Sequence, residues 1–219
     1  IKNPLTPIQL SAERLEMKLS GKLADPEQAM LTKSVKTIVD QVDAMKRLVN
    51  EFRDYARLPA AELKPVDLNG LVTDVLQLYL DEGGEVAAAV PIRVDLDPKA
   101  NAILGDAQQL RQVVHNLLQN AQDATEGCEV REVTIKTRWN PVSRRVRLTV
   151  QDTGTGFPEH ILKRAFEPYV TTKAKGTGLG LAVVKKIADE HGARVDLSNR
   201  TADGRVLGAQ VSISFTVAT

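Results

Sequence analysis

Cysteine, aromatic residues and long apolar runs are all scarce in this sequence of 219 residues, and each shortage excludes a class of protein. The single cysteine, Cys128, excludes an internal disulfide and a cysteine-rich metal site. Phe, Trp and Tyr make up 4% of the residues, so aromatic platforms for stacking bases are not expected. Lys and Arg number 29 against 28 Asp and Glu, and the net charge of +1 gives no basis for a nucleic-acid partner.

No apolar run approaches the roughly 20 residues that a membrane-spanning helix needs, and there is no signal peptide. We therefore expect no membrane contact by this stretch of chain. The sequence also lacks an initiator Met, and its opening residues, Ile1-Lys2-Asn3-Pro4, look like the middle of a helix. We interpret the chain as part of a longer protein with a membrane anchor upstream.

Residues 1–58 carry an apolar repeat with spacings of three and four residues. The repeat has two sets of positions: Leu5, Ile8, Ala12, Leu15 and Leu19, then Leu31, Val35, Ile38, Val42, Met45, Val49, Phe52 and Ala56. This period is typical of helices that pack side by side in a bundle or coiled coil. Gly21 and Pro26 separate the two sets and predict a helical hairpin. Two hairpins would bury the stripe in a four-helix homodimer; the alternative is a hairpin that packs on its own C-terminal domain.

Residues 59–65 are predicted to be a linker, and residues 66–219 a second domain. We expect helices over 69–82, 106–125 and 179–191, and strands over 66–68, 91–97, 133–139, 146–150, 195–197 and 211–217. Strands interspersed with helices indicate an α/β sandwich. The fold class predicted for the whole chain is therefore α+β, a helical hairpin followed by an α/β sandwich.

Three polar residues, Asn116, Asn120 and Asp123, share one face of the helix expected over 106–125. Their oxygens suit a hard cation such as Mg²⁺, which usually keeps waters and takes few protein ligands beside phosphate oxygens. The alternative is a solvated helix face or a cap.

A second candidate follows directly on the strand expected over 146–150, and its residues are Asp152, Thr153, Gly154, Thr155 and Gly156. A carboxylate there can accept a hydrogen bond from the exocyclic amine of adenine, whereas guanine presents a carbonyl at that edge. The glycines let the backbone pass close to a flat ring. The alternative is a common Asp-Thr-Gly turn.

A third candidate stands at the start of the helix expected over 179–191, and its residues are Gly176, Thr177, Gly178, Leu179, Gly180 and Leu181. A helix start offers unpaired N–H donors to phosphate. The preceding polar residues form either a lid with a phosphate-reaching lysine or a loop with solvated lysines: Thr171, Thr172, Lys173 and Lys175. Neither a P-loop nor a Gly-x-Gly-x-x-Gly fingerprint is present. The sequence thus predicts a site for ATP and Mg²⁺ built without a P-loop.

These motifs resemble, in order and spacing, those of the histidine kinases of bacterial two-component systems. The Asn-rich helix resembles the N box of that family, and Asp152–Gly156 resembles its G1 box. Phe166-Glu167-Pro168-Tyr169 resembles the F box, and Gly176–Leu181 the G2 box. The resemblance covers essentially the whole chain.

The resemblance implies a dimerisation and phosphotransfer hairpin over 1–58 and an ATP-binding domain of the Bergerat type over 66–219. Within the kinases, the opening stretch Ile1–Arg14 looks like the nitrogen-regulation branch, with its NtrY-like and NtrB-like members.

Roles for individual residues also follow from the resemblance. Asn120 would hold Mg²⁺, Asp152 would bind adenine, and Phe166 would anchor the lid. Lys173 would approach the γ-phosphate. The remaining nucleotide-binding positions would be Asp123, Gly154, Gly156, Thr172, Gly176, Thr177, Gly178, Leu179, Gly180 and Leu181.

Asn116 stands where the hydrolytic relatives of these kinases carry a Glu that activates water. An amide cannot be a general base, which fits a kinase that must keep its phosphoryl group from water.

One part of the family motif falls outside the printed chain. The motif is His-Glu-x-x-Asn-Pro, and Asn3-Pro4 places its His two residues before Ile1. Asn3 would orient water for dephosphorylation of the partner. The histidines present, His115, His160 and His191, all lie in the expected ATP-binding domain. We therefore expect this chain to bind ATP without phosphorylating itself.

The sequence is thus interpreted as the catalytic core of a dimeric sensor histidine kinase, in the cytoplasmic portion of a bacterial sensor anchored in the inner membrane. The parent would transfer the γ-phosphoryl group of Mg²⁺·ATP to its His and then to an Asp on a response-regulator receiver domain. Two alternatives remain, a Bergerat-fold ATPase that drives a clamp and a non-catalytic dimeric scaffold or regulator phosphatase.

Overall fold

The computed structural model describes residues 4–81, 90–173 and 176–218. The chain divides into two compact units, 1–58 and 59–219. In the described part of the chain, no helix is both long enough and apolar enough to cross a bilayer.

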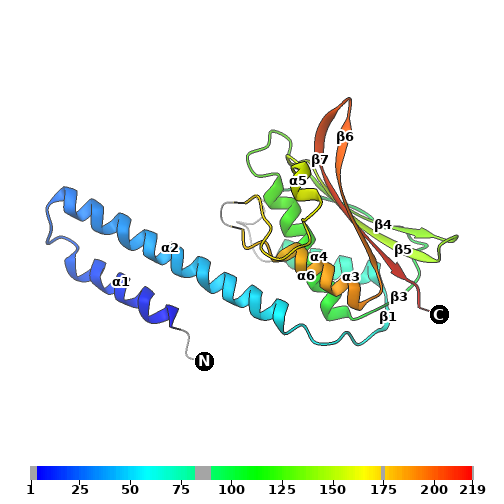
Figure 1. Ribbon diagram of the computed structural model, residues 1–219, viewed down its shortest axis with the longest axis horizontal. Coiled ribbons are helices and arrows are strands. Elements are labelled where there is room, and N and C mark those ends of the chain that lie inside the picture. The colour runs from blue at the N-terminus through cyan, green and yellow to red at the C-terminus, as the bar shows by residue number, and fades with distance from the viewer. Residues whose placement is uncertain (1–3, 82–89, 174–175, 219) are drawn as a thin grey trace. The chain divides into compact units, whose positions relative to one another are not determined.

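The first unit is a hairpin of two helices, α1 (Leu5–Leu19) and α2 (Asp25–Ala56) (Figure 1). Gly21 lies in the turn between them, and Pro26 lies in the first turn of α2, where its missing N–H interrupts no helical hydrogen bond. The helical hairpin predicted from the apolar repeat is confirmed.

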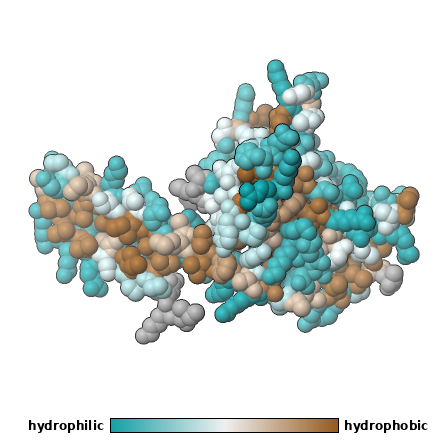
Figure 2. Space-filling view, viewed as in Figure 1, coloured by the Kyte–Doolittle hydropathy of each residue, from teal (hydrophilic) through white to brown (hydrophobic). Residues whose placement is uncertain are grey.

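Packing within the hairpin buries part of the apolar repeat and leaves the rest exposed. Ala12, Val35 and Val42 are buried. Other positions of the repeat are 36–56% exposed, namely Ile8, Leu15, Leu19, Ile38, Met45, Val49 and Phe52. Figure 2 shows apolar side chains, in brown, running along the hairpin. The hairpin therefore has an exposed apolar face that the packing of α1 against α2 does not bury.

The second unit is built, within the described residues, on a five-stranded sheet of order β2-β4-β5-β7-β6. The strands are β2 (Ile92–Asp95), β4 (Val133–Asn140), β5 (Arg145–Asp152), β6 (Arg194–Ala202) and β7 (Arg205–Thr216). The β2–β4 pair is parallel, and the other pairs are antiparallel. Two further short strands, β1 (Lys64–Val66) and β3 (Ile103–Gly105), pair with each other.

Helices cover one face of this sheet: α3 (Leu68–Asp81), α4 (Ala107–Ala124) and α6 (Gly180–Glu190) (Figure 1). A short helix, α5 (Glu159–Leu162), follows β5. In β5, alternate residues Val146, Leu148 and Val150 are buried, as expected for a strand with one covered face. The core of the unit lies between the sheet and the three longer helices, and the predicted α/β sandwich is confirmed.

The boundary between the first strand and α3 differs from the expectation. We expected strand over 66–68, but Leu68 is already helical. The carboxylate of Asp67 accepts a hydrogen bond from the Asn69 amide at 3.1 Å, and the Asp67 carbonyl accepts one from the Leu71 amide at 3.0 Å. Asp67 thus caps α3 and ends the extended segment.

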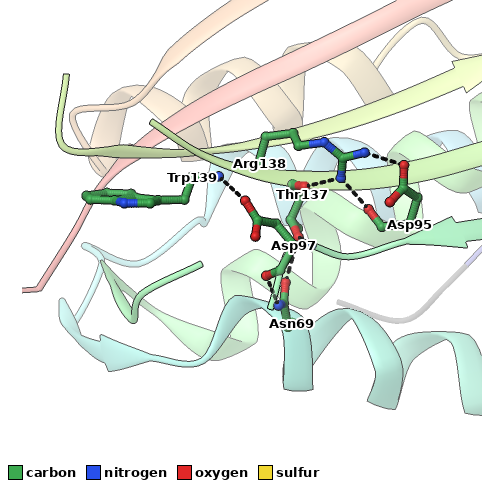
Figure 3. Close-up of polar contacts among 6 residues, drawn as sticks. All are labelled: Asn69, Asp95, Asp97, Thr137, Arg138 and Trp139. Carbon is green, nitrogen blue, oxygen red and sulfur yellow. Dashed lines mark hydrogen bonds and ion pairs between the residues drawn. The ribbon is translucent and has the colours of Figure 1, made fainter. Parts of the chain in front are cut away.

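A polar network joins α3 to the end of β2 and to β4 (Figure 3). Nδ2 of Asn69 donates to the carbonyl of Asp97 at 2.8 Å. Oγ1 of Thr137 donates to Oδ1 of Asn69 at 2.7 Å and accepts from the Asp97 amide at 2.9 Å. Because Thr137 is fully buried, these bonds satisfy groups that would otherwise be costly to bury.

The Asp97 carboxylate continues this network. It accepts hydrogen bonds from the backbone amides of Trp139 and Lys99, both at 2.9 Å. These bonds hold the pKa of Asp97 below its ordinary value, because they favour the charged form. Arg138 of β4 donates to the Asp95 carbonyl at 3.1 Å and pairs with the Asp95 carboxylate, which fastens β2 to its neighbour (Figure 3).

Candidate functional site

The candidate site lies where α4 and α6 pack side by side in opposite directions. The end of α6 meets the start of α4, because Nε2 of His191 accepts a hydrogen bond from the Asp106 amide at 2.9 Å. Nδ1 of His191 must then carry the proton, and it donates to the Ile187 carbonyl at 2.8 Å. At the other end, a Cβ added to Gly180 would lie 3.2 Å from Nδ2 of Asn120. The last turns of α4 therefore lie beside the first turn of α6.

The polar face predicted on α4 is in contact with Lys173, a residue of the loop that precedes α6. Nζ of Lys173 donates to Oδ1 of Asn120 at 3.2 Å and to Oδ2 of Asp123 at 2.7 Å. Asn116 lies one turn earlier on the same face and is half-buried. We predicted that Lys173 would approach a phosphate. In the structure, its ammonium group donates to the side-chain oxygens of Asn120 and Asp123.

The same contact indicates that the side-chain oxygens of Asn120 and Asp123 suit a metal ion. They already bind the positively charged ammonium group of Lys173, and amide and carboxylate oxygens are the ligands that Mg²⁺ takes. Among the described residues there is no group of three His, Cys, Asp or Glu that could hold a metal. A magnesium ion at Asn120 would therefore need phosphate or water oxygens to complete its coordination.

The first turn of α4 is capped by a side chain, whereas among the described residues none caps the first turn of α6. Asp106 caps α4 by accepting hydrogen bonds from the amides of Gln108 at 3.0 Å and Gln109 at 3.2 Å. The N-cap of α6 is Leu179, a buried residue, and within the described chain no side chain caps that helix. Its first N–H groups can therefore receive an anion.

Gly178 holds the glycine-rich segment against the preceding loop. Its φ is 71°, and a Cβ there would lie 2.6–2.8 Å from backbone atoms of Tyr169 and Val170. The Tyr169 amide donates to the Gly178 carbonyl at 3.0 Å. Both the dihedral angle and the close approach require glycine. The predicted lid anchor, Phe166, is half-buried four residues before Val170.

The remaining glycine-rich positions lie between this loop and α6. A Cβ on Gly176 would lie 2.6 Å from Oγ1 of Thr171, and Oγ1 of Thr177 accepts a hydrogen bond from the Leu179 amide at 3.3 Å. Leu181 is half-buried in the first turn of α6, and Thr172 is exposed.

Asp152 is the one strongly buried carboxylate among the predicted site residues, with 7% of its surface exposed. Its Oδ1 accepts hydrogen bonds from the amides of Gly154 at 2.9 Å and Ala209 at 3.0 Å. Burial raises the pKa of Asp152, against the opposing effect of these two bonds. Strand β7 approaches closely because it has Gly208 here, where a Cβ would lie 2.0 Å from the Asp152 carbonyl oxygen.

The segment after Asp152 runs between the end of α4 and the β6–β7 hairpin. A Cβ on Gly154 would lie 2.3 Å from the Ala124 carbonyl oxygen. A Cβ on Gly156 would lie 2.6 Å from Val206 and 2.8 Å from Oδ1 of Asn199. At both predicted glycines, neighbouring atoms thus occupy the space that a side chain would need.

Two residues of β6 that sequence reasoning missed hold this segment. Asn199 accepts from the Phe157 amide and donates to the Phe157 carbonyl, both at 2.8 Å. Nη1 of Arg200 donates to the Asp152 carbonyl at 2.8 Å. They escaped notice because only strand pairing brings β6 to a segment more than forty residues earlier. The predicted Asn3 lies outside the described residues.

Two family models match the chain in sequence order. The His Kinase A (phospho-acceptor) domain matches residues 1–61. The model described as histidine kinase-, DNA gyrase B- and HSP90-like ATPase matches residues 105–218.

Curated relatives agree with the branch expected from the first residues. Nitrogen regulation protein NtrY of Azorhizobium caulinodans is 37% identical over 98% of this chain and 27% of its own length. Sensory histidine kinase/phosphatase NtrB of Rhodobacter capsulatus is 36% identical over 94% of this chain and 57% of its own. The chain thus spans only part of the relatives that it matches.

The solved structures include a full-length ShkA in complex with AMPPNP. It is 28% identical to this chain, with a TM-score of 0.69, over 99% of this chain and 44% of that one. With both domain models matched in order, over a hairpin and an α/β sandwich, the chain belongs to the histidine kinase family, as its four nucleotide-binding motifs indicated.

Proposed function

We propose that this chain is the Mg²⁺·ATP-binding core of a sensor histidine kinase. The whole protein would transfer the γ-phosphoryl group to its own His and then to an Asp on a response-regulator receiver domain. The observation that carries the proposal is that Asn120 adjoins Gly180. Oxygen ligands for a cation and an uncapped helix start for phosphate thus lie next to each other, as a metal–phosphate complex requires.

Each part of the nucleotide has residues suited to it. Asp152 would accept a hydrogen bond from the adenine amine, and the first amides of α6 would bind the phosphates. Lys173, whose side chain already lies at this end of α4, would exchange its partners Asn120 and Asp123 for the γ-phosphate. Asn120 would hold Mg²⁺, which would neutralise the negative charge that develops on the phosphoryl oxygens during transfer.

Catalysis in such a site is mainly positioning and charge stabilisation. Asn116 lies on the same face of α4 as Asn120 and has no basic group with which to activate water. The bound nucleotide would therefore keep its γ-phosphoryl group for transfer to a side chain rather than for hydrolysis.

We propose that the protein is a homodimer through residues 1–58. The exposed half of the apolar repeat supports this, because a second hairpin would cover it in a four-helix bundle. Residues 59–65 would link this domain to an ATP-binding domain over 66–219. Asn3, just after the phosphoacceptor His, would orient water for removal of phosphate from the regulator.

The sensor relatives support a wider setting for this core. We infer that it is the cytoplasmic portion of a sensor anchored in the inner membrane, with no membrane contact or nucleic-acid partner of its own. The net charge of +1 supports the absence of a nucleic-acid partner in this inference.

Calorimetric titration of the chain with ATP, with and without Mg²⁺, tests the nucleotide site. We expect Asn120→Ala to lose the Mg²⁺-dependent part of the affinity, about tenfold or more. Gln119→Ala, an exposed neighbour on the same helix, should bind as the parent does. In the full-length protein, γ-labelled ATP should give acid-labile label. Steady ATP hydrolysis that Asn116→Ala abolishes would instead identify an ATPase.

A further inference from the structure

The β6–β7 hairpin contacts the Asp152 segment at three points that the family motifs do not include. The Ala209 amide donates to Oδ1 of Asp152 from β7, and Arg200 donates to the Asp152 carbonyl from β6. Asn199 makes two hydrogen bonds with the backbone of Phe157. We propose that Arg200 and Asn199 are positioning residues that set the preference for the nucleotide base by acting through Asp152. The proposal rests on the nucleotide site described above.

The first step of the argument is the orientation of the Asp152 carboxylate. Among the described residues, both hydrogen bonds to this side chain go to Oδ1, from Gly154 and Ala209. A carboxylate with one oxygen held by two amides presents the other, Oδ2, in a single direction. Strand β7 thus fixes which oxygen meets the base.

The second step concerns the charge of that carboxylate. A carboxylate only accepts hydrogen bonds and so suits the amine of adenine, whereas a protonated carboxyl can donate to the carbonyl of guanine. Burial raises the pKa of Asp152, while the positive charges of Arg200 and Lys173 lower it. Arg200 therefore helps keep the adenine-binding form.

The third step concerns the backbone that follows. The Asn199 side chain satisfies both the amide and the carbonyl of Phe157, and it occupies the space that a side chain on Gly156 would need. The β6–β7 register shifts between Arg200 and Thr201, where Leu207 of β7 has no paired residue on β6. Asn199 and Arg200 lie next to this shift, and both reach the Asp152 segment.

The test is calorimetric titration of the chain and its variants with three probes, Mg²⁺·ATP, Mg²⁺·GTP and Mg²⁺·tripolyphosphate. For Arg200→Met and Asn199→Ala we expect a loss of about tenfold in ATP affinity, a smaller ATP-to-GTP ratio, and unchanged tripolyphosphate affinity. Arg194→Met removes an exposed arginine from the same strand and should bind all three probes as the parent does.

The pH profile separates positioning from simple damage. Loss of the Arg200 charge raises the pKa of Asp152 further, so the ATP affinity of Arg200→Met should begin to fall at a higher pH than that of the parent when the titrations are repeated at successively lower pH. Arg200→Lys should restore the pH profile of the parent.

Two results would overturn the inference alone: parent-like ATP affinity in both variants, or equal losses for ATP and tripolyphosphate. Failure of the parent chain to bind Mg²⁺·ATP would overturn the proposed function as well. Circular dichroism checks folding, and if Asn199→Ala does not fold, Asn199→Asp takes its place. It keeps the acceptor for the Phe157 amide and loses the donor to the carbonyl.

Discussion

Replacement of Met45 by Glu in the hairpin should strongly weaken the proposed dimer. Met45 belongs to the apolar repeat and is 48% exposed on α2, so a partner hairpin would bury about half of its side chain. Full burial of such a side chain contributes about 1.5–3 kcal/mol, and half of it therefore about 0.7–1.5 kcal/mol in each protomer. Over two protomers this amounts to about 1.5–3 kcal/mol, or a rise in the dissociation constant of about 10- to 150-fold.

A charge at this position adds a desolvation cost, so the lower figure is a minimum. Sedimentation equilibrium over a range of concentrations measures the dissociation constant directly. Met17→Glu is the matched control, because Met17 is 79% exposed on α1 and lies outside the repeat. The reasoning would be refuted by a dissociation constant that Met45→Glu leaves unchanged, or that Met17→Glu raises equally.

Three further predictions concern the second unit. Gly178→Ala should lower ATP affinity about tenfold or more in titrations, because its Cβ would lie 2.6 Å from the Tyr169 backbone. Gly127→Ala, with a similar φ of 76° but open space, should bind as the parent does. Lys173→Met should lower the affinity for ATP more than that for ADP. Its free energy of unfolding, measured by denaturant titration, should change by less than about 1 kcal/mol, because the Lys173–Asp123 ion pair is solvated. Asp97→Asn should be less stable than the parent in urea titrations at neutral pH. Because the pKa of Asp97 is lowered in the fold, this difference should be present above about pH 4, the unfolded value, and should vanish as pH falls through the folded value; a difference independent of pH would contradict it.

Local patterns in the sequence predicted the helical hairpin and several of the segments that build the site. The 3.5-residue repeat predicted the hairpin because side chains on one helix face recur at that period. The face of Asn116, Asn120 and Asp123 followed from the same geometry, and the structure places Lys173 against two of these residues. Glycine clusters at the ends of a strand and before a helix located the close backbone packing of Gly154 and Gly178.

Very short elements and features that depend on distant partners could not be predicted in this way. Strand β3 has three residues and α5 has four, which are too few for a hydrophobic period to be visible. Asn199 and Arg200 act on the Asp152 segment only because β6 pairs with β7 and β7 with β5. Gly208, which lies within β7, is a sequence feature consistent with that close approach, because a glycine inside a strand often marks one.

The antiparallel contact of α4 and α6 has an electrostatic consequence for the proposed site. Aligned peptide dipoles give a helix a partial negative charge at its last turn and a partial positive charge at its first. The last turns of α4, with Asn120, therefore offer a field that favours a cation, directly beside a start of α6 that favours an anion. Either ion alone lies near one helix end that attracts it and one that repels it. A metal–phosphate pair satisfies both ends, so the helix dipoles themselves should make magnesium and nucleotide bind cooperatively.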